Sequence, residues 1–374
     1  MTETEPVVQL TRQDNSLSSR RAVSYRCSEQ FVPILQRLRA SVVISTYQAG
    51  KVAVLSPHHS QEDALSLTFA NFDQPMGLAV TPGKLAVGAR RQVWFHTAAH
   101  QFAGRLREGE QGSTCFLARS SHVTGNIHVH DMAWAGSELW IANTLFSCLC
   151  TLGGQSNFVP RWRPSFITEL AAEDRCHLNG LALDSGRPKY VTMLAQSNEP
   201  GGWRPTKAHS GCVLDVDTGE AVVHSLCMPH SPRLHDGKLW VLNSGRGEIN
   251  LVDLATGRAD VIERVPGYTR GLSLAGSFAF VGLSKIRETA VFGGLPIGER
   301  HEELRCGLAV IDLIRGQSVA WFEFTSGVEE VFDVKILPEF GQLILRGPHS
   351  TEDEQNEVWI LPPLSEASSP VTPT

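Results

Sequence analysis

The sequence predicts an all-β protein that folds as a single β-propeller of four-stranded antiparallel blades, and three observations support this prediction. A short apolar phrase recurs six times along the 374 residues. Each copy is followed, a few residues later, by a second short apolar run. The stretch 231–262 also reads as one complete unit of four strands. Repeats of this kind are typical of propeller blades.

The six copies of the phrase share a pattern of small and apolar residues more than they share identities. They occupy positions 76–80, 130–134, 179–183, 231–235, 270–274 and 332–336. A β-sandwich or a jelly roll would also contain many short strands. Neither fold gives a reason for one phrase to recur, so the propeller is preferred.

The unit at 231–262 shows how one blade is expected to be built. The dipeptide Asp236-Gly237 indicates a tight turn after the first strand, because Asp-Gly is a strong hairpin signal. The four strands are expected near Arg233, at 238–242, at 248–254 and at 259–262. A chain of such units gives a ring of sheets around a central channel.

Counting the middle hairpins predicts seven blades. They begin near Val42, Leu85, Leu139, Tyr190, Leu239, Phe278 and Leu343. The last unit ends at 358–361, one strand short, and a segment such as 22–26 could complete it and close the ring. Six blades with a composite closing blade are the alternative, since only six units carry the phrase.

The ends of the chain read differently from its centre. Residues 1–20 are polar without periodicity and predict a flexible leader. The apolar spacing within 30–38 predicts a short amphipathic helix. The propeller domain is expected over 21–364, and the Ser/Pro/Thr-rich stretch 365–374 is expected to be a disordered tail.

Composition and charge narrow the class of function. A net charge of -6 gives no reason to expect a nucleic-acid or anionic-membrane partner, and there is no apolar run of about 18 residues that could span a membrane. The acidic start does not resemble a secretory signal, so a cytoplasmic protein is expected. The eight scattered cysteines are then expected to be reduced, with a redox role for Cys148 and Cys150 as an alternative.

Polar residues gather where a propeller places its site. The start of the first strand and the end of the second strand of every blade lie on one face of the ring. Expected strand-one starts supply Gln74, His128, His130, His177, Asn179, His230, Arg270, Glu329 and Glu330. Expected strand-two ends supply Arg90, Arg91, Asn143, Gln196, Asn243, Ser284 and Arg346.

Three histidines open successive units and suggest two kinds of chemistry. His130, His177 and His230 could together bind Zn²⁺, Mn²⁺ or Fe²⁺, because neutral imidazole suits these metals. Alternatively, His130 and His177 act as acid and base, with Glu330 as a further candidate base. Polar side chains at these places can also simply hydrogen-bond the exposed backbone at strand ends.

A binding pocket for an anionic or polar ligand is the other expectation for this face. Guanidinium groups recognise carboxylate and phosphate well. The expected substrate-binding residues are Arg90, Asn143, Asn179, Asn243, Arg270, Arg346 and Trp203. Trp203 lies in the long connection 196–210, which with 284–306 either covers the ligand or forms a solvated surface insertion.

Several segments also resemble an uncharacterised family of bacterial conserved hypothetical proteins. They are STYQAGK at 45–51, NFDQPMGLA at 71–79, HVHD at 128–131, HLNGLA at 177–182 and SG at 244–245. The resemblance extends over 24–361 and implies a propeller-like scaffold with no established reaction. More loosely, the repeats resemble the NHL, gluconolactonase and strictosidine-synthase propellers, which hold ligand and often metal on the axis. Gluconolactonase-like proteins use mainly Glu, Asn and Asp for this, so their activity is not transferred to a chain that offers histidine.

Two hypotheses for function follow. The first is an enzyme, a lyase, isomerase or hydrolase with or without a bound metal, acting on a small or peptidyl polar substrate at the axis. The second is a non-catalytic propeller that binds a ligand, a peptide or a protein partner on the same face. The sequence lacks G-x-S-x-G, G-x-x-x-x-G-K-[ST], G-x-G-x-x-G and H-E-x-x-H motifs, which disfavours the enzyme classes that depend on them.

Overall fold

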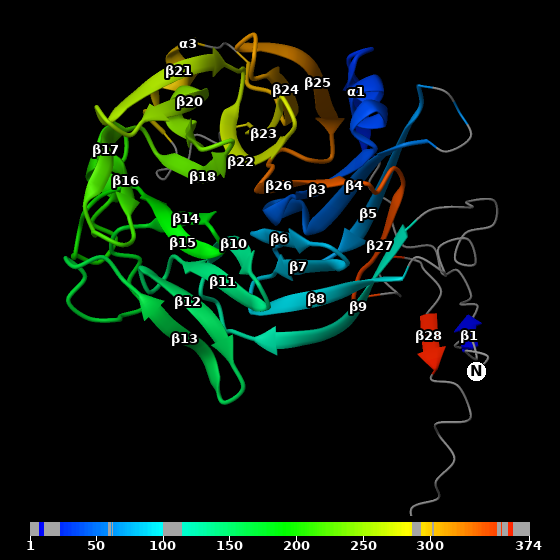
Figure 1. Ribbon diagram of the computed structural model, residues 1–374, viewed down its shortest axis with the longest axis horizontal. Coiled ribbons are helices and arrows are strands. Elements are labelled where there is room, and N and C mark those ends of the chain that lie inside the picture. Colours follow the sequence, from blue (N-terminus) through cyan, green and yellow to red (C-terminus); the bar gives the residue numbers. More distant parts are fainter. Residues whose placement is uncertain are drawn as a thin grey trace, which may run out of the picture.

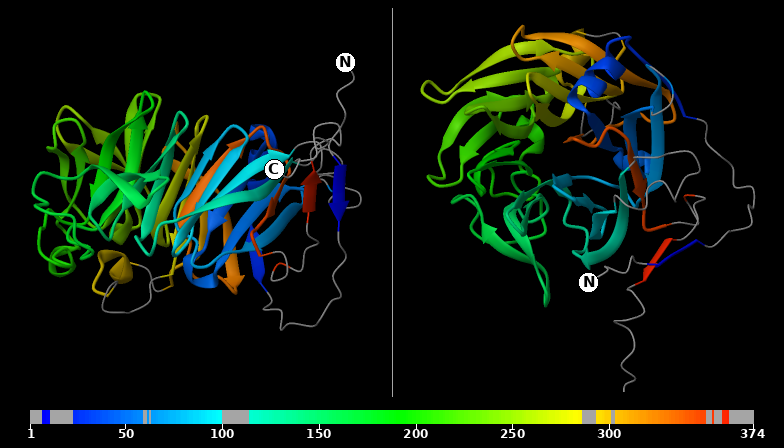
Figure 2. Two further views of the ribbon diagram at one scale, coloured as in Figure 1. Left: turned by 90° about the horizontal axis from the view of Figure 1, so that it is seen from below. Right: turned by 45° about the vertical axis from the view of Figure 1, so that its right-hand side comes forward.

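The structure is a computed structural model, and it forms a ring of β-sheets (Figure 1). It describes residues 7–10, 23–58, 61, 63–99, 114–285, 293–300, 303–349, 353 and 358–361. In these residues the strands make six propeller blades and one separate two-stranded sheet. Figure 2 shows that separate sheet at one side of the ring.

Three consecutive blades follow the expected antiparallel order of four strands. The first contains β10 (Val129–Ala135), β11 (Glu138–Asn143), β12 (Cys148–Gly153) and β13 (Ser156–Trp162). The second contains β14 (Leu178–Asp184), β15 (Arg187–Met193), β16 (Gly211–Asp215) and β17 (Ala221–Leu226). The third contains β18 (Pro229–His235), β19 (Lys238–Asn243), β20 (Glu248–Asp253) and β21 (Arg258–Arg264), so the unit expected at 231–262 is confirmed.

Two blades carry a fifth strand at their outer edge. One contains β6 (Leu78–Thr81), β7 (Lys84–Gly88), β8 (Gln92–Ala99) and β9 (Thr114–Val123), with β27 (Leu343–Arg346) parallel to β9. The other contains β22 (Tyr268–Ala275), β23 (Phe278–Ser284), β24 (Gly307–Asp312) and β25 (Gln317–Ser326), with β2 (Ser24–Cys27) antiparallel to β25. The added strands cover edges that would otherwise be open to solvent.

The sixth blade joins the two ends of the ring. Its innermost strand is β26 (Asp333–Pro338), and its other strands are β3 (Ala40–Ser45), β4 (Lys51–Pro57) and β5 (Leu65–Asn71). Asp333 stands opposite Ser45 in this sheet. Every residue of β3 is buried, because the strand lies between two others and its faces are covered by neighbouring blades.

The preferred count of seven blades was therefore wrong, and the composite six-blade alternative is confirmed. The hairpin expected near Val42 belongs to the blade that β26 opens, so it does not make a blade of its own. The hairpin expected near Leu343 does not form; β27 instead runs parallel to β9. The segment at 22–26 was expected to complete the last blade, but β2 lies on the outside of β25.

The short N-terminal helix is confirmed as α1 (Phe31–Leu38), which buries Phe31 and Leu35 against the closing blade. Elsewhere in the described residues the helical turns are η1 (Tyr47–Ala49), η3 (Arg204–Thr206), η4 (Ser244–Arg246) and α3 (Pro296–Arg300). No helix in the described residues is both long and apolar enough to cross a membrane.

The ends of the chain are described only in part. Of the expected leader, β1 (Val7–Leu10) is described, and it pairs with β28 (Val358–Leu361). The expected tail at 365–374 lies outside the described residues.

The second residue of the repeated phrase alternates around the ring. It is glycine in three blades, at Gly77, Gly180 and Gly271, and Asp131, Pro232 or Asp333 in the blades between them. A Cβ at Gly271 would lie 2.8 Å from the Cα of Asp333, so the small residue lets neighbouring inner strands approach.

The intervening blades supply side-chain acceptors to their neighbours. Asp333 accepts a hydrogen bond from the backbone N–H of Leu78, and Asp131 accepts one from Leu181. The hydroxyl of Ser231 accepts one from Gly271. Each of these bonds links the innermost strand of one blade to that of the next, which fixes the spacing around the axis.

Four charged side chains fill the middle of the channel. Arg233 binds Asp131 at 2.7 Å, and Lys335 binds Asp333 at 2.9 Å. These residues come from β10, β18 and β26, which are strands of alternate blades, so they meet at the axis. They separate an axial cavity on one face of the ring from a second chamber of about 300 Å³ on the other.

Candidate functional site

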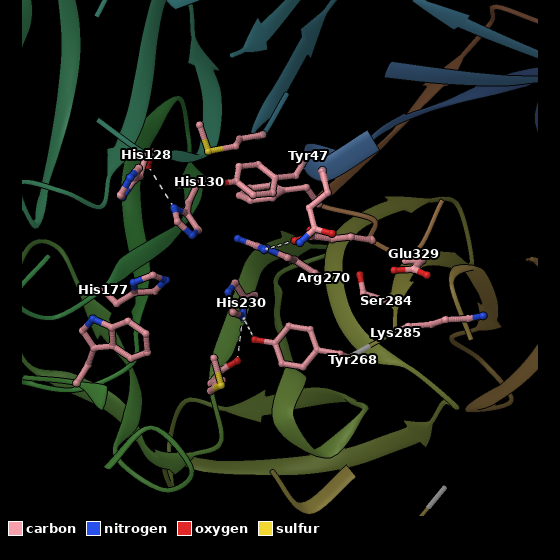
Figure 3. A pocket seen from close by; sticks show the side chains of 16 residues that line it. Tyr47, His128, His130, His177, His230, Tyr268, Arg270, Ser284, Lys285 and Glu329 are labelled. Carbon is pink, nitrogen blue, oxygen red and sulfur yellow. Dashed lines mark hydrogen bonds and ion pairs between the residues drawn. The ribbon is translucent and has the colours of Figure 1, made fainter. Parts of the chain in front are cut away.

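The axial cavity has a volume of about 300 Å³, at the small end of the range for ligand pockets. Its wall combines imidazoles and aromatic rings with two cations and two carboxylates (Figure 3). The lining residues are Tyr47, Gln48, Met76, His128, His130, His177, Trp203, Met228, His230, Tyr268, Arg270, Ser284, Lys285, Glu329, Glu330 and Phe332.

His177 is held by a carboxylate that was not predicted from the sequence. Its Nδ1 lies 3.0 and 2.9 Å from the two carboxylate oxygens of Asp174. The indole Nε1 of Trp203 donates a hydrogen bond of 3.1 Å to the same carboxylate, and the indole lies against the imidazole with ring centroids 4.4 Å apart. Because a carboxylate oxygen accepts, this contact favours a proton on Nδ1, and in the neutral ring Nε2 then has the lone pair.

His130 is held in the same way by backbone and hydroxyl oxygens. Its Nδ1 lies 3.2 Å from the carbonyl oxygen of His128 and 2.8 Å from Oγ1 of Thr144. The Thr144 hydroxyl donates to the carbonyl of Leu178, so it is free to accept from the imidazole. Burial, followed by the nearby charges of His177 and Arg270, lowers the pKa of His130 well below its ordinary value.

His230 completes the group of three imidazoles. Its Nδ1 lies 2.9 Å from the carbonyl oxygen of Met228 and 3.0 Å from Oγ of Ser244. Burial, then the charge of Arg270, lowers the pKa of His230 well below its ordinary value. Both His130 and His230 are therefore neutral at neutral pH.

Several residues at the start of the inner strands have left-handed backbone conformations. The φ angle is 53° at His128, 52° at His177 and 50° at Met228, and it is 49° at Asp174 behind the cavity. Such angles are uncommon for residues with side chains, and they cluster where function requires a fixed geometry.

Arg270 lies buried between a ring and a carboxylate. Its Cζ is 3.4 Å from the ring centroid of Phe332, and Nη1 is 3.3 Å from Oε1 of Glu330. Burial lowers the pKa of Arg270, and Glu330 opposes this shift. Lys285, which follows β23, adds a second positive charge to the wall.

Six of the predicted site residues line the cavity. They are His130, His177, His230, Arg270, Glu330 and Trp203. Of these, Trp203 is only 2% exposed, so it forms part of the wall and not an exposed lid. The sequence identified the first five because strand-one starts converge on the axis, and Trp203 because it lies in the long connection 196–210.

Five predicted substrate-binding residues do not line the cavity. Asn143 accepts a hydrogen bond from the backbone N–H of Phe146, in the turn after its own strand, and Asn243 accepts one from Cys227, just before β18. Asn179 accepts one from Thr192 within its blade. Arg90 is exposed at a turn and Arg346 lies in β27 at the outer edge of a blade; neither reaches the axis.

Several lining or supporting residues were missed by the sequence reasoning. Asp174 lies in a loop without periodicity, so no sequence pattern indicated that it would support the site. Tyr268 carried a signal, because it precedes Arg270 by two positions on one strand and so shares its face. The conspicuous segment at 45–51 contributes Tyr47 and Gln48 through the turn η1.

The predicted metal site finds no preformed geometry in the described residues. Within them, no three His, Cys, Asp or Glu side chains are arranged to hold a metal ion. The rings of His130 and His177 meet edge to face, with centroids 4.8 Å apart. Binding of Zn²⁺, Mn²⁺ or Fe²⁺ by the three histidines stays a prediction.

The cysteines show no redox pair. All eight are free, and all but Cys27 are buried. A hydrogen bond with Cys148, together with burial, raises the pKa of Cys150 well above its ordinary value. A reactive thiolate is therefore disfavoured at this place.

The comparisons with known proteins give a family and a fold. A family model described as a domain of unknown function (DUF4915) matches residues 29–344. A search of curated proteins gave no match.

Among solved structures, a chain of the nidogen/laminin complex is similar, with a TM-score of 0.51 and 11% identity, covering 81% of this chain and 99% of that chain. TolB from Acinetobacter baumannii has a TM-score of 0.46 and 13% identity, covering 80% of this chain and 66% of that one. A protein of unknown function from Bacteroides caccae has a TM-score of 0.46 and 11% identity, covering 80% and 98%. The nidogen/laminin match shows a similar fold and carries no function across.

Proposed function

This chain belongs to the DUF4915 family, a domain family of unknown function, and we propose its function from the axial cavity. The protein is an enzyme that moves a proton on a small polar substrate, with His177 as the general acid–base. The observation that carries this proposal is the contact of both Asp174 oxygens with Nδ1 of His177.

The contact between Asp174 and His177 supports the role in two ways. A base is effective when a third group fixes its tautomer and its orientation, and here the carboxylate does both. The negative charge also stabilises the imidazolium that forms when Nε2 takes a proton from the substrate. Trp203 holds the carboxylate in place with its own hydrogen bond of 3.1 Å.

The reaction class follows from the other lining groups. Ser284 accepts a hydrogen bond from the backbone N–H of Val331 and donates one to the carbonyl of the same residue. Among the described lining residues it is the only serine, threonine or cysteine, so a hydroxyl or thiol nucleophile lacks support. Proton abstraction and return, as in an isomerase or a lyase, are favoured over hydrolysis through an ester or thioester intermediate.

Deuterium exchange tests the proposal without knowledge of the product. A library of small polar acids, amines and hydroxy compounds is first screened for binding by thermal shift. Bound compounds are then incubated with the protein in D₂O, and NMR follows the loss of their C–H signals. We expect catalysed exchange that falls by about 10²–10⁴-fold in His177→Gln.

The matched control is His224→Gln, because His224 is exposed on β17 at the outer edge of its blade. This variant should exchange at the rate of the unchanged protein. The enzyme proposal fails if the compounds that bind never exchange, or if exchange survives in His177→Gln. Either result would favour a non-catalytic ligand-binding propeller. The alternative of a protein partner held by Trp203 is weakened, because that side chain is buried.

A further inference from the structure

The three imidazoles present the same nitrogen to the cavity. Each Nδ1 lies within hydrogen-bonding distance of an oxygen that can only accept. For His130 this oxygen is the backbone carbonyl of His128, 3.2 Å from Nδ1. For His177 it is a carboxylate oxygen of Asp174, at 2.9 Å. For His230 it is the backbone carbonyl of Met228, also at 2.9 Å. A neutral imidazole has one donor and one acceptor, so in all three rings Nε2 is the acceptor.

The three acceptors belong to one side of the cavity. His130 is in β10, His177 directly precedes β14 and His230 is in β18, so they come from successive blades. In the described part of the chain, no donor is hydrogen-bonded to any of the three Nε2 atoms. Burial keeps His130 and His230 neutral, as their lowered pKa values show.

The other side of the cavity carries the formal charges. Arg270 and Lys285 are positive, and Glu329 and Glu330 are negative, so the lining charges balance. Figure 3 shows the three imidazoles at one end of the cavity and Lys285 at the other, with Arg270 between them. Because the lining charges already balance, a ligand with a net charge would leave one charge without a partner in a partly buried site. Such an unpaired charge costs binding free energy.

We propose that the cavity binds a small zwitterionic amino acid, with its ammonium group at Nε2 of His130 and His230 and its carboxylate at Arg270 and Lys285. Nε2 of His177 is then left for the proton on carbon. An ammonium group has N–H donors and no acceptor, which matches nitrogen atoms that only accept. A guanidinium matches a carboxylate in shape and charge. Tyr47 adds an aromatic ring to the wall, and aromatic faces favour a cation.

This proposal names the substrate class of the proposed enzyme and rests on the same cavity, but its test is binding and not turnover. Titration calorimetry measures Kd for a panel of amino acids, for the matching deaminated acids and hydroxy acids, and for the amino acid methyl esters. We expect at least one amino acid to bind about tenfold or more tightly than its deaminated acid and its ester. Equal affinity for the deaminated acid, or no binding by any amino acid, overturns the proposal.

Variants locate the binding. His130→Phe and His230→Phe keep a ring of similar shape but remove the acceptor, so each should weaken amino acid binding by about tenfold. His224→Phe, at the exposed edge of β17, should leave Kd unchanged. Binding that requires added Zn²⁺ and is lost with chelator would overturn the proposal in favour of a metal site.

A second measurement does not depend on whether the variants fold. Nitrogen NMR of the unchanged protein, labelled in histidine, reports which ring nitrogen carries the proton. Unprotonated Nε2 atoms in His130 and His230 whose signals move on amino acid binding support the proposal, and protonated Nε2 atoms in these two rings overturn it. If amino acids bind in this way but no C–H exchange occurs, the substrate class stands and the proposed catalysis fails.

Discussion

Arg233 and Asp131 face each other across the axis of the ring, and two hydrogen bonds of 2.7 and 3.1 Å join the guanidinium to the carboxylate. The two residues lie in β18 and β10, with one blade between them. Burial alone would raise the pKa of Asp131, but Arg233 and Lys335 outweigh it and lower this pKa. The pair thus joins two blades through a carboxylate that is almost completely buried.

Removing one member of this pair should be costly. In Arg233→Met the carboxylate of Asp131 keeps only Lys335, whose Nζ is 3.7 Å away, as a charged partner. We expect the free energy of unfolding in urea to fall by about 3–5 kcal/mol. In the control Arg258→Met, an exposed pair with Asp260 is broken, and the loss should stay below about 1 kcal/mol. Equal losses in the two variants would contradict this prediction.

Gly282 lets β23 pass close to Arg270. A Cβ at this position would lie 2.1 Å from the carbonyl oxygen of Arg270, which is backbone and cannot turn aside. Gly282→Ala should therefore destabilise the protein by about 1–3 kcal/mol and displace the arginine from the cavity. Gly154→Ala, where nothing lies within 4 Å of the added atom, is the control. Unfolding in urea measures the loss of stability, and ligand affinity measures the displacement of Arg270. A Gly282→Ala variant with unchanged stability and affinity would refute the close approach.

Asp174→Asn tests the carboxylate behind His177. The amide can donate to Nδ1, which favours the tautomer with the proton on Nε2 and removes the charge that stabilises the imidazolium. Proton exchange on a bound substrate should slow by about 10²–10⁴-fold. Glu173→Gln changes a neighbouring carboxylate that binds Arg175 and should leave the rate near its original value. A purely structural role for Asp174 would lower the melting temperature without this difference in rate.

His96 should make the protein sensitive to acid. It is 1% exposed in β8, and burial lowers its pKa to about 4. The unfolded chain binds this proton near pH 6.5 and the folded chain does not, so stability is lost as the pH falls from about 6.5 towards 4. At pH 5 this loss is about 2 kcal/mol.

His96→Leu should remove that part of the loss. The fall in unfolding free energy between pH 7.5 and pH 5 should be smaller than in the unchanged protein, by about 2 kcal/mol. His224→Leu, at an exposed position, should lose as much stability as the unchanged protein. Parallel pH profiles for all three proteins would count against the buried imidazole as the cause.

The blades were predictable where strands pair with their neighbours in the chain. The unit from Arg233 onwards contained its own turns, and its strands form as expected. The count failed at Val42 and Leu343, because their partners are distant. Ser45 in β3 pairs with Asp333, 288 positions away, and β27 pairs in parallel with β9. Short-range pattern carries no information about such pairs.

The site was predictable only in part, for a related reason. His130 and Arg270 could be found because the start of the first strand always faces the axis. Asn143 occupies a similar place but uses its amide oxygen to hold its own turn at Phe146. Asp174 serves the site from a loop, and its link to Trp203 joins residues 29 positions apart. The sequence pattern therefore locates the face of the ring that holds the site. The role of each residue there depends on loops, whose sequences show no periodic pattern.

The pairing of β26 with β3 has a consequence for biosynthesis. While the ribosome makes this protein, β3 and its hairpin emerge early and expose an inner edge that has no neighbour until Asp333 has been made. The four main strands of each of the other five blades are made before β26, and these blades must wait, in the nascent chain, for the strand that closes the ring. Contacts between such distant residues slow folding, so this interval is when the protein is most exposed to wrong pairing. A chaperone that shields the edge of β3 would act during that interval.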